Sequence, residues 1–388
     1  MVEQTTTRKT YKFKLKPTLE QERQFDTILW RCRTVYNTAL EQRKTIYVQR
    51  GISVTYYQQK AELPGIKAAM PEYSEVHSQV LQDVVLRVDR AFQAFFRRVK
   101  SGETPGYPRF HGRDRFNSFT YPQYDNGARL DNGLLVLSKI GRVAVRWSRP
   151  IEGTPKTVTL SREADGWYVS ISCADVPVQS LEPTGQEIGI DLGLESFATL
   201  ADGTMIHNPR CYRNAERHLK TAQRKVARRK KGSKRRRKAV QLLARAHQKV
   251  RRQRQDFQHK TALQLVRTYD TIYHEDLQVA NMVKNHSLAK SIADAGWSGF
   301  LTILTFKAGC AGKRVQAVNP AYTSQACSGC GVVVKKGLSV RWHSCPDCGT
   351  SLHRDHNAAL NILRRGHEQS TDGQSVQALT WASRPSVA

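Results

Sequence analysis

Alternating apolar and polar residues open the chain. Residues 11–16 read YKFKLK, so an aromatic or apolar side chain alternates with lysine, and this period of two predicts a half-buried strand. Thr18 and Gln21 then fit a capping box at the start of a helix. The apolar residues of that helix recur at helical spacing, at Phe25, Leu29, Cys32, Tyr36 and Leu40.

A second helix and a group of short strands complete the first half. The helix is predicted over residues 74–100, and a break before it is expected at Pro64, Gly65 and Pro71. Short alternating segments at 134–137, 142–146, 157–160 and 167–171 then predict strands separated by turns. A strand, a helical insertion and further strands indicate a small β-barrel interrupted by a helical module.

The second half has an α/β pattern. After a linker at residues 182–184, the sequence EIGIDLGL predicts a buried strand, and SFATLADG predicts a second strand and a turn. Further strands are expected at 271–274 and 314–318, a helix at 288–306 and a short helix after residue 353. The segment between 210 and 260 is predicted to be helical and to break at Gly232 and Ser233. The last 20 residues are expected to be disordered or weakly docked.

Positive charge is concentrated in one segment. The 388 residues hold 62 Lys and Arg against 33 Asp and Glu, a net charge of +29. Residues 210–260 contain 21 basic and two acidic residues, a net charge of +19, so the other 337 residues carry +10. Such a field favours a polyanionic partner, and nucleic acid is expected. The candidate contacts are Arg224, Arg228, Arg229, Lys230, Lys231, Lys234, Arg235, Arg236, Arg237, Lys238, Arg251, Arg252 and Arg254.

Hydropathy and cysteine usage narrow the class of protein. The longest apolar stretch, from Gly299 to Phe306, is shorter than the ~18 residues that span a bilayer. The first ten residues are polar and lack the apolar segment of a signal peptide. A cytoplasmic protein without a membrane partner is therefore expected, with Cys32, Cys173, Cys211 and Cys310 as reduced thiols.

The other four cysteines form two Cys-x-x-Cys pairs. Cys327 and Cys330 are followed, 14 residues later, by Cys345 and Cys348. Small residues and glycine at these turns allow backbone amides to point at sulfur, and four thiolates satisfy tetrahedral zinc. One structural Zn²⁺ is expected, while disulfides and an iron–sulfur cluster remain as alternatives.

Three acids stand in apolar surroundings. Asp191 lies within an apolar strand, Glu275 ends a strand, and Asp355 opens a helix. If the three carboxylates converged, each pair would repel by about 3 kcal/mol at ~5 Å and an effective dielectric near 20, so divalent cations would be needed between them. Two Mg²⁺ ions held in this way can cleave phosphodiesters. The alternative for each acid is an ordinary ion pair, and spacing alone does not show that the three meet.

Several motifs together resemble the TnpB family, the OrfB-type proteins of insertion sequences, which are related to compact type V CRISPR effectors. They are IGIDLGL, YHEDLQVANM, NPAYTSQACSGCG with CPDCG, and HRDHNAALNI, with KPTLEQ, VYNTAL, PRF and SFTYP in the first half. The resemblance covers most of the chain. At His353 the chain departs from the family motif, which usually has an acid there.

The resemblance implies a fold and a division into domains. A wedge-like β-barrel would comprise residues 1–17 and 101–181, and a helical recognition module residues 18–100. A RuvC-like nuclease domain of RNase H type would comprise 182–320 and 350–368, with the zinc ribbon inserted at 321–349 and a tail at 369–388. The catalytic, magnesium-binding triad would be Asp191, Glu275 and Asp355.

The implied activity is RNA-guided cleavage of DNA. The partners would be a guide RNA from the transposon end, double-stranded target DNA with a short flanking motif, and a separate transposase encoded by the same element. The segment from Tyr107 to Tyr121 could contact RNA or flanking DNA, or could serve as barrel core. A transposase, a nuclease-dead RNA-guided repressor and a zinc-ribbon binding protein without chemistry are the alternative functions.

Overall fold

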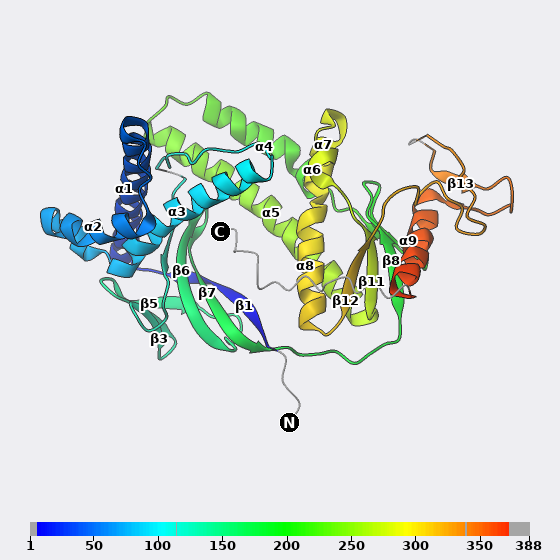
Figure 1. Ribbon diagram of the computed structural model, residues 1–388, viewed down its shortest axis with the longest axis horizontal. Coiled ribbons are helices and arrows are strands. Elements are labelled where there is room, and N and C mark those ends of the chain that lie inside the picture. The colour runs from blue at the N-terminus through cyan, green and yellow to red at the C-terminus, as the bar shows by residue number, and fades with distance from the viewer. Residues whose placement is uncertain (1–5, 114, 338–339, 372–388) are drawn as a thin grey trace. The chain divides into compact units, whose positions relative to one another are not determined.

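The computed structural model describes residues 6–113, 115–337 and 340–371. The chain divides into two compact units, residues 1–177 and 178–388, which are described one at a time (Figure 1). The finer division into wedge, recognition module, nuclease domain and zinc ribbon remains a prediction.

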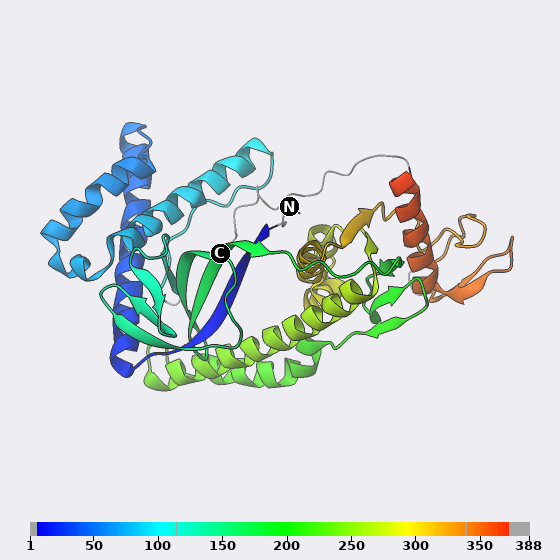
Figure 2. The ribbon, with the colours of Figure 1, turned by 90° about the horizontal axis from the view of Figure 1, so that it is seen from below.

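A seven-stranded antiparallel sheet forms the framework of the first unit. Its strand order is β2-β6-β7-β1-β5-β4-β3, and Figure 2 shows β1, in blue, within this sheet. In the described residues β2 and β3 are edges that do not pair with each other, so the predicted barrel is an open half-barrel. The strands are β1 (Thr6–Lys16), β2 (Ser118–Tyr121), β3 (Ala128–Asp131), β4 (Leu134–Leu137), β5 (Gly141–Arg146), β6 (Thr154–Glu163) and β7 (Gly166–Pro177).

Alternation along β1 builds one face of the core. Tyr11, Phe13 and Leu15 are each at most 3% exposed, and Phe13 lies opposite Val169 of β7. The lysines between them point to the other face, where Lys12 and Lys14 lie over the ring of Tyr168. The period-two pattern of the sequence is thus the pattern of burial.

The helices of this unit are α1 (Leu19–Arg50), α2 (Tyr56–Ala69), the 3-10 helix η1 (Pro71–Glu75) and α3 (Ser78–Lys100). They meet the sheet through α1 and α3, which contact β2, and α2 packs on α3. The capping box at Thr18 and Gln21 is confirmed, because the side chain of each residue accepts a hydrogen bond from the backbone N–H of the other. The five apolar positions predicted for α1 are all at most 4% exposed, which fixes the face that meets the sheet.

The predicted break at Pro64 and Gly65 is wrong, because both residues lie inside α2. A proline inside a helix removes one internal hydrogen bond, but tertiary contacts outweigh this loss. Gln59 is 3% exposed; its Nε2 donates to the Ala39 carbonyl at 2.8 Å and its Oε1 accepts from Arg43 Nε at 2.8 Å. These buried bonds to α1 hold α2 in place.

A five-stranded sheet is the centre of the second unit. Its order is β10-β9-β8-β11-β12. Strands β8, β11 and β12 are parallel to one another, and β9 pairs antiparallel with both β8 and β10. The strands are β8 (Glu187–Asp191), β9 (Ser196–Leu200), β10 (Met205–His207), β11 (Thr271–Glu275) and β12 (Arg314–Val318). The helices are α4 (Cys211–Ala227), α5 (Lys234–Thr268), α6 (Val279–Met282), α7 (His286–Ala295), α8 (Trp297–Cys310) and α9 (Arg354–Thr371).

The helix breaks in this unit follow capping chemistry. The predicted break at Gly232 and Ser233 is confirmed, and Ser233 caps α5 by accepting from the Arg236 N–H at 3.1 Å. The single helix predicted over 288–306 is wrong: α7 and α8 meet at Gly296, which has φ 66°. Gln258 of α5 donates to the Ala295 and Gly296 carbonyls, and only glycine adopts this left-handed conformation easily.

The last helix extends farther than expected. Residues 369–371 of the predicted tail belong to α9, and residues 372–388 lie outside the described residues. No helix in the described ranges has the length and apolarity required to cross a membrane.

Candidate active site

Asp191 and Glu275 lie at the same end of neighbouring parallel strands. Asp191 is the last residue of β8, and Glu275 is the last residue of β11. Because Ile190 of β8 is paired with His274 of β11, each acid stands one residue beyond this pair. Loops and ligands commonly meet at the carboxyl ends of parallel strands, so this register brings the two carboxylates to one edge of the sheet.

Asp355 reaches the same edge from α9. It lies in the first turn of that helix, and its side chain is 13% exposed. A Cβ added to Gly193, two residues after Asp191, would lie 3.8 Å from Asp355 Oδ2. The third predicted acid therefore stands over the turn that follows Asp191.

Two glycines bring α9 close to the sheet. A Cβ at Gly189 of β8 would collide with the Ala359 carbonyl of α9, and a Cβ at Gly366 of α9 would collide with the Tyr273 ring of β11. His356 of α9 also contacts the Ala201 carbonyl, with its Nε2 at 3.1 Å. The close approach of backbone to backbone requires glycine here, and it fixes where the helix, with Asp355, begins.

The acids share an electrostatic environment. Burial raises the pKa of Asp191 well above its ordinary value, the charges of Glu275 and Asp355 raise it further, and Arg354 opposes them. Burial also raises the pKa of Glu275, against a hydrogen bond from Thr323 and the charge of Arg365. Carboxylates held this close in a poorly solvated place favour a cation between them.

The three carboxylates are neighbours without forming a tight cluster. In the described ranges, the four paired cysteines are the one group of three or more potential metal ligands whose atoms all lie within 4.8 Å of one another. Hard oxygen donors at one sheet edge, with a raised Asp191 pKa, are nonetheless the donor set that suits Mg²⁺. The structure thus brings the predicted acids to one place and leaves their metal ligation as a prediction.

Thr323 and Asn361 support the acids and were not predicted from the sequence. The Thr323 hydroxyl donates to Glu275 Oε1. Asn361, which is fully buried, donates through Nδ2 to the carbonyls of Thr323 and Ala326 at 2.8 and 2.7 Å. An asparagine on the apolar face of a predicted helix is the one signal that could have indicated such a buried bond.

Asn357 and Arg354 join α9 to the segment that holds the first cysteines. Asn357 accepts from the Ser328 N–H at 2.9 Å and donates to the Ala326 carbonyl at 2.7 Å. Arg354 donates to Ser324 at 3.0 Å. His353 stands where the family motif usually has an acid. Its Nδ1 accepts a hydrogen bond from the Asp355 N–H at 3.3 Å and lies 4.0 Å from Asp355 Oδ2. Hydrogen bonds from α9 therefore connect the acid site to the cysteine site.

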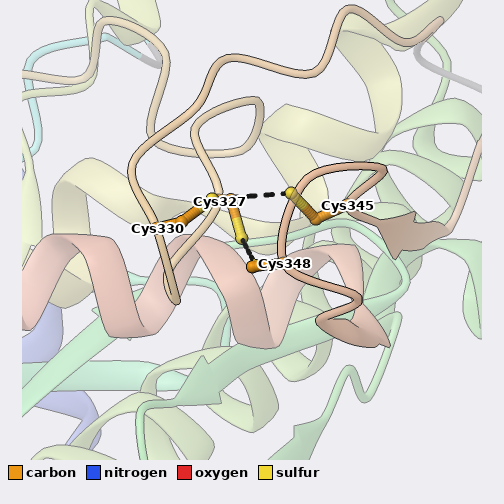
Figure 3. Close-up of side chains that lie close together, drawn as sticks. All are labelled: Cys327, Cys330, Cys345 and Cys348. Atoms are coloured by element: carbon orange, nitrogen blue, oxygen red, sulfur yellow. Dashed lines mark hydrogen bonds between the residues drawn. The ribbon is translucent and has the colours of Figure 1, made fainter.

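The four cysteines converge as predicted (Figure 3). The sulfurs of Cys327 and Cys348 are 3.6 Å apart, and those of Cys330 and Cys345 are 3.5 Å apart. A disulfide needs about 2.05 Å, whereas tetrahedral zinc with Zn–S bonds of about 2.3 Å separates sulfurs by roughly 3.8 Å. The pairs are not disulfides, and their spacing fits a single tetrahedral metal ion.

Hydrogen bonds stabilise the thiolate of Cys327, whereas the pKa of Cys330 is raised. Burial raises the pKa of Cys327, but bonds from the Cys330 amide, His343 and the Gly329 amide outweigh it and lower the pKa to about 5. The Gly329 N–H lies 3.4 Å from the Cys327 sulfur. A thiolate at neutral pH is the form that binds zinc.

The basic segment forms two helices, α4 and α5, which pack side by side (Figures 1 and 2). Arg236 and Arg254 are half-buried and have structural partners. Arg236 donates to the Val226 and Arg229 carbonyls, and Arg254 donates to the Ala293 carbonyl. The other eleven candidates are exposed: Arg224, Arg228, Arg229, Lys230, Lys231, Lys234, Arg235, Arg237, Lys238, Arg251 and Arg252.

Comparison with protein families gives three matches. Residues 170–286 match the OrfB_IS605 model, described as a probable transposase, and residues 297–362 match the Cas12f1-like TNB domain. Residues 5–51 match a helix-turn-helix domain of OrfB_IS605, although the structure has the strand β1 and the single helix α1 there. The matches together span both units.

Individual proteins extend the likeness to nearly the whole chain. A Streptomyces pristinaespiralis protein named "Putative RNA-guided DNA endonuclease" is 36% identical over 97% of this chain and 94% of its own length. InsQ of Escherichia coli K12, which has the same designation, is 31% identical over 95% and 94%. Cas12f1 from a cryo-EM complex with guide RNA and target DNA has a similar fold, with a TM-score of 0.54 at 13% identity over 92% of this chain and 98% of that one. The chain belongs to the OrfB family of IS605-type insertion sequences, the TnpB family.

Proposed function

We propose that this protein is an RNA-guided DNA endonuclease whose nuclease centre consists of Asp191, Glu275 and Asp355. One observation carries the proposal: the register of β8 and β11 brings two acids to one sheet edge, and α9 brings the third. Relatives of nearly full length are named for this activity. The parallel strands with a helix against them agree with a RuvC-like domain of RNase H type.

In this proposal the three carboxylates hold two Mg²⁺ ions. When bound, the metal supplies an activated water and stabilises the leaving 3′ oxygen of the cleaved strand. The chain's own residues position the ligands. Thr323 orients the Glu275 carboxylate through its hydroxyl, and Arg354 lies close enough to Asp191 to lower its pKa.

The zinc ribbon is a structural part of this centre. Zn²⁺ on Cys327, Cys330, Cys345 and Cys348 would fix the loop that holds Thr323, since Asn361 joins that loop to α9. Metal ligation contributes on the order of 10 kcal/mol to the folding of such small sites. Zinc would therefore act on cleavage through the position of Glu275, at a distance from the reacting phosphate.

The eleven exposed basic residues of α4, of α5 and of the segment between them would hold guide RNA and target DNA through phosphates. Phosphate contacts give affinity and register without reading bases, which suits a nuclease whose sequence specificity comes from base pairing with a guide. The protein itself would recognise a short motif beside the target. A separate transposase would be encoded by the same element.

Purification followed by sequencing of bound RNA tests the function. We expect RNA of defined sequence to copurify, and the complex to cut DNA that matches the RNA and has the flanking motif, provided that Mg²⁺ is present. A repressor would bind the same DNA without cutting it, and a transposase would join DNA ends without RNA. Absence of both the RNA and the guided cut would disprove the proposal.

A further inference from the structure

A cavity of about 270 Å³ opens in the first unit between α1, the segment that precedes β2, and β6. It lies outside the acid centre and the basic helices. The aromatic and charged residues that line it are Trp30, Arg33 and Asp26 of α1, Arg113 and Phe116 of the segment before β2, and Arg162 of β6. Two aromatic rings, three guanidinium groups and one carboxylate therefore surround one hollow.

The cavity is built into the fold. Phe116 at 5% exposure and Leu29 at 4% form a buried apolar floor. Asn37 of α1 donates to the His111 carbonyl at 3.0 Å and accepts its N–H at 2.9 Å, and the His111 ring lies 4.6 Å from the ring of Tyr36. These contacts hold the segment with Arg113 against α1, so the cavity is held open before any ligand enters.

The charge of the cavity favours an anion. Arg162 pairs with Asp26 at 2.7 Å. Within the described part of this unit, neither Arg33 nor Arg113 has a carboxylate partner, and Arg33 Nε is buried without a hydrogen-bond partner. A buried donor left unpaired costs about 1–3 kcal/mol. An incoming phosphate would satisfy it, since guanidinium groups bind phosphate in a planar, bidentate manner.

The aromatic side chain narrows the ligand further. Trp30 is 51% exposed although it lines the cavity, so about half of the side chain is open to a flat apolar partner. Bases that have left a helical stack bind to such rings, with about 1–3 kcal/mol per base by alanine substitution. A phosphate site and an open indole in one hollow match a nucleotide better than a simple anion.

We propose that this cavity binds one unstacked nucleotide of a nucleic-acid strand, with the base on Trp30 and a phosphate on Arg33 and Arg113. The inference deepens the proposed function, because it rests on the protein holding nucleic acid. RNA and DNA share this chemistry, and the test distinguishes them. The aromatic and arginine-rich segment from Tyr107 to Tyr121 would then have two roles. Phe116, Phe119 and Tyr121 belong to the core, and Arg113 would contact the ligand.

Ultraviolet cross-linking of the full chain with its copurified nucleic acid tests the site directly. We expect a nucleotide adduct on the peptide that contains Trp30, and its mass tells ribose from deoxyribose. Nucleotide adducts confined to α4 and α5, or a cross-link to a protein at Trp30, would overturn the proposal. Neither result depends on whether the complex cuts DNA.

A matched pair of variants gives the energetic test. Trp30→Ala should weaken binding of fluorescein-labelled oligo(dT) or oligo(U) by about fivefold or more, measured by anisotropy at salt that suppresses non-specific contacts. Tyr47→Ala, on the same helix and 61% exposed, should bind as the wild type does. The loss should vanish for the same probe with abasic sites. Equal affinity of the two variants, or an equal loss for the abasic probe, would refute base stacking.

A charge variant tests the phosphate contact. Arg113→Gln, at an exposed position, should lower the slope of log affinity against log salt by about one for the intact and the abasic probe alike. An unchanged slope would contradict the phosphate contact. If guided cutting fails in the wild type while these effects appear, the function is wrong and the nucleotide site stands.

Discussion

Replacing Asp191 with asparagine should stabilise the protein in the absence of magnesium. The variant keeps the shape of the side chain and removes its charge. The pKa of Asp191 is raised well above its ordinary value by burial and by two neighbouring carboxylates, so the ionised form opposes folding. Burial raises the pKa of Glu275 as well, so both acids at this sheet edge are poorly solvated.

The magnitude follows from electrostatics. Two like charges about 6 Å apart would repel by about 3 kcal/mol at an effective dielectric near 20, and the charge of Arg354 opposes this repulsion at Asp191. Each pKa unit corresponds to about 1.4 kcal/mol. A net gain of about 2 kcal/mol is expected, equivalent to a rise in Tm of roughly 4–8 °C for a unit of this size.

The effect has a definite dependence on pH. Because the folded-state pKa of Asp191 lies above its unfolded value, its contribution to stability is fully present below the unfolded pKa, near 3.9. It is lost as pH rises toward the folded pKa. The gain in Tm of Asp191→Asn over the wild type should therefore grow as pH rises above about 3.9.

Differential scanning calorimetry in magnesium-free buffer that contains zinc measures both effects, and avoiding chelators keeps the ribbon intact. Glu187→Gln is the control, because Glu187 is an exposed acid at the opposite end of β8. Its Oε2 accepts from the Tyr273 hydroxyl at 3.1 Å and lies 2.8 Å from His367 Nε2. Glutamine keeps an acceptor there, so stability should change by no more than about 1 kcal/mol. Magnesium should raise the Tm of the wild type and of the control more than that of Asp191→Asn. A destabilised Asp191→Asn, or an equal magnesium response in all three proteins, would refute the electrostatic reasoning.

Three further substitutions test the scaffold. Asn361→Ala removes the donor to the buried Thr323 carbonyl, while the Ala326 carbonyl keeps its bond from Asn357, and should cost about 1–3 kcal/mol in urea denaturation. Unchanged stability would contradict the buried bonds. Cys345→Ser should abolish bound zinc in atomic absorption, whereas Cys310→Ser should retain it; equal zinc content would disprove the site. Gly366→Ala should destabilise the protein by about 1–3 kcal/mol through overpacking. Gly309→Ala, whose added Cβ meets nothing within 4 Å, should stabilise it by about 1 kcal/mol. Similar thermal shifts for the two variants would contradict the close approach of α9 to β11.

Periodicity and local chemistry were enough to predict several elements. The alternation in β1, the capping box of α1 and the break before α5 are local features, and the structure has each of them. The break at Pro64 failed because buried bonds between Gln59 and α1 outweigh a local preference. Gly296 was missed for a similar reason, since its contact with Gln258 joins positions far apart in sequence.

The site could be predicted in part. Acids in apolar settings indicated Asp191, Glu275 and Asp355, but their meeting depends on the register of β8 with β11, which hydropathy does not contain. Asn361 was not identified, because a helical pattern shows which face is buried and not which carbonyl a buried amide will meet. The cavity at Trp30 likewise requires a segment some 80 residues later to pack on α1.

The most direct test of the central claim compares two acids on one strand. Asp191→Asn and Glu187→Gln, each purified with the same RNA, are offered matching DNA with magnesium, and cut strands are separated on a denaturing gel. We predict no cleavage by Asp191→Asn and wild-type cleavage by Glu187→Gln, with equal amounts of bound RNA. Cleavage by Asp191→Asn at the wild-type rate would contradict this prediction.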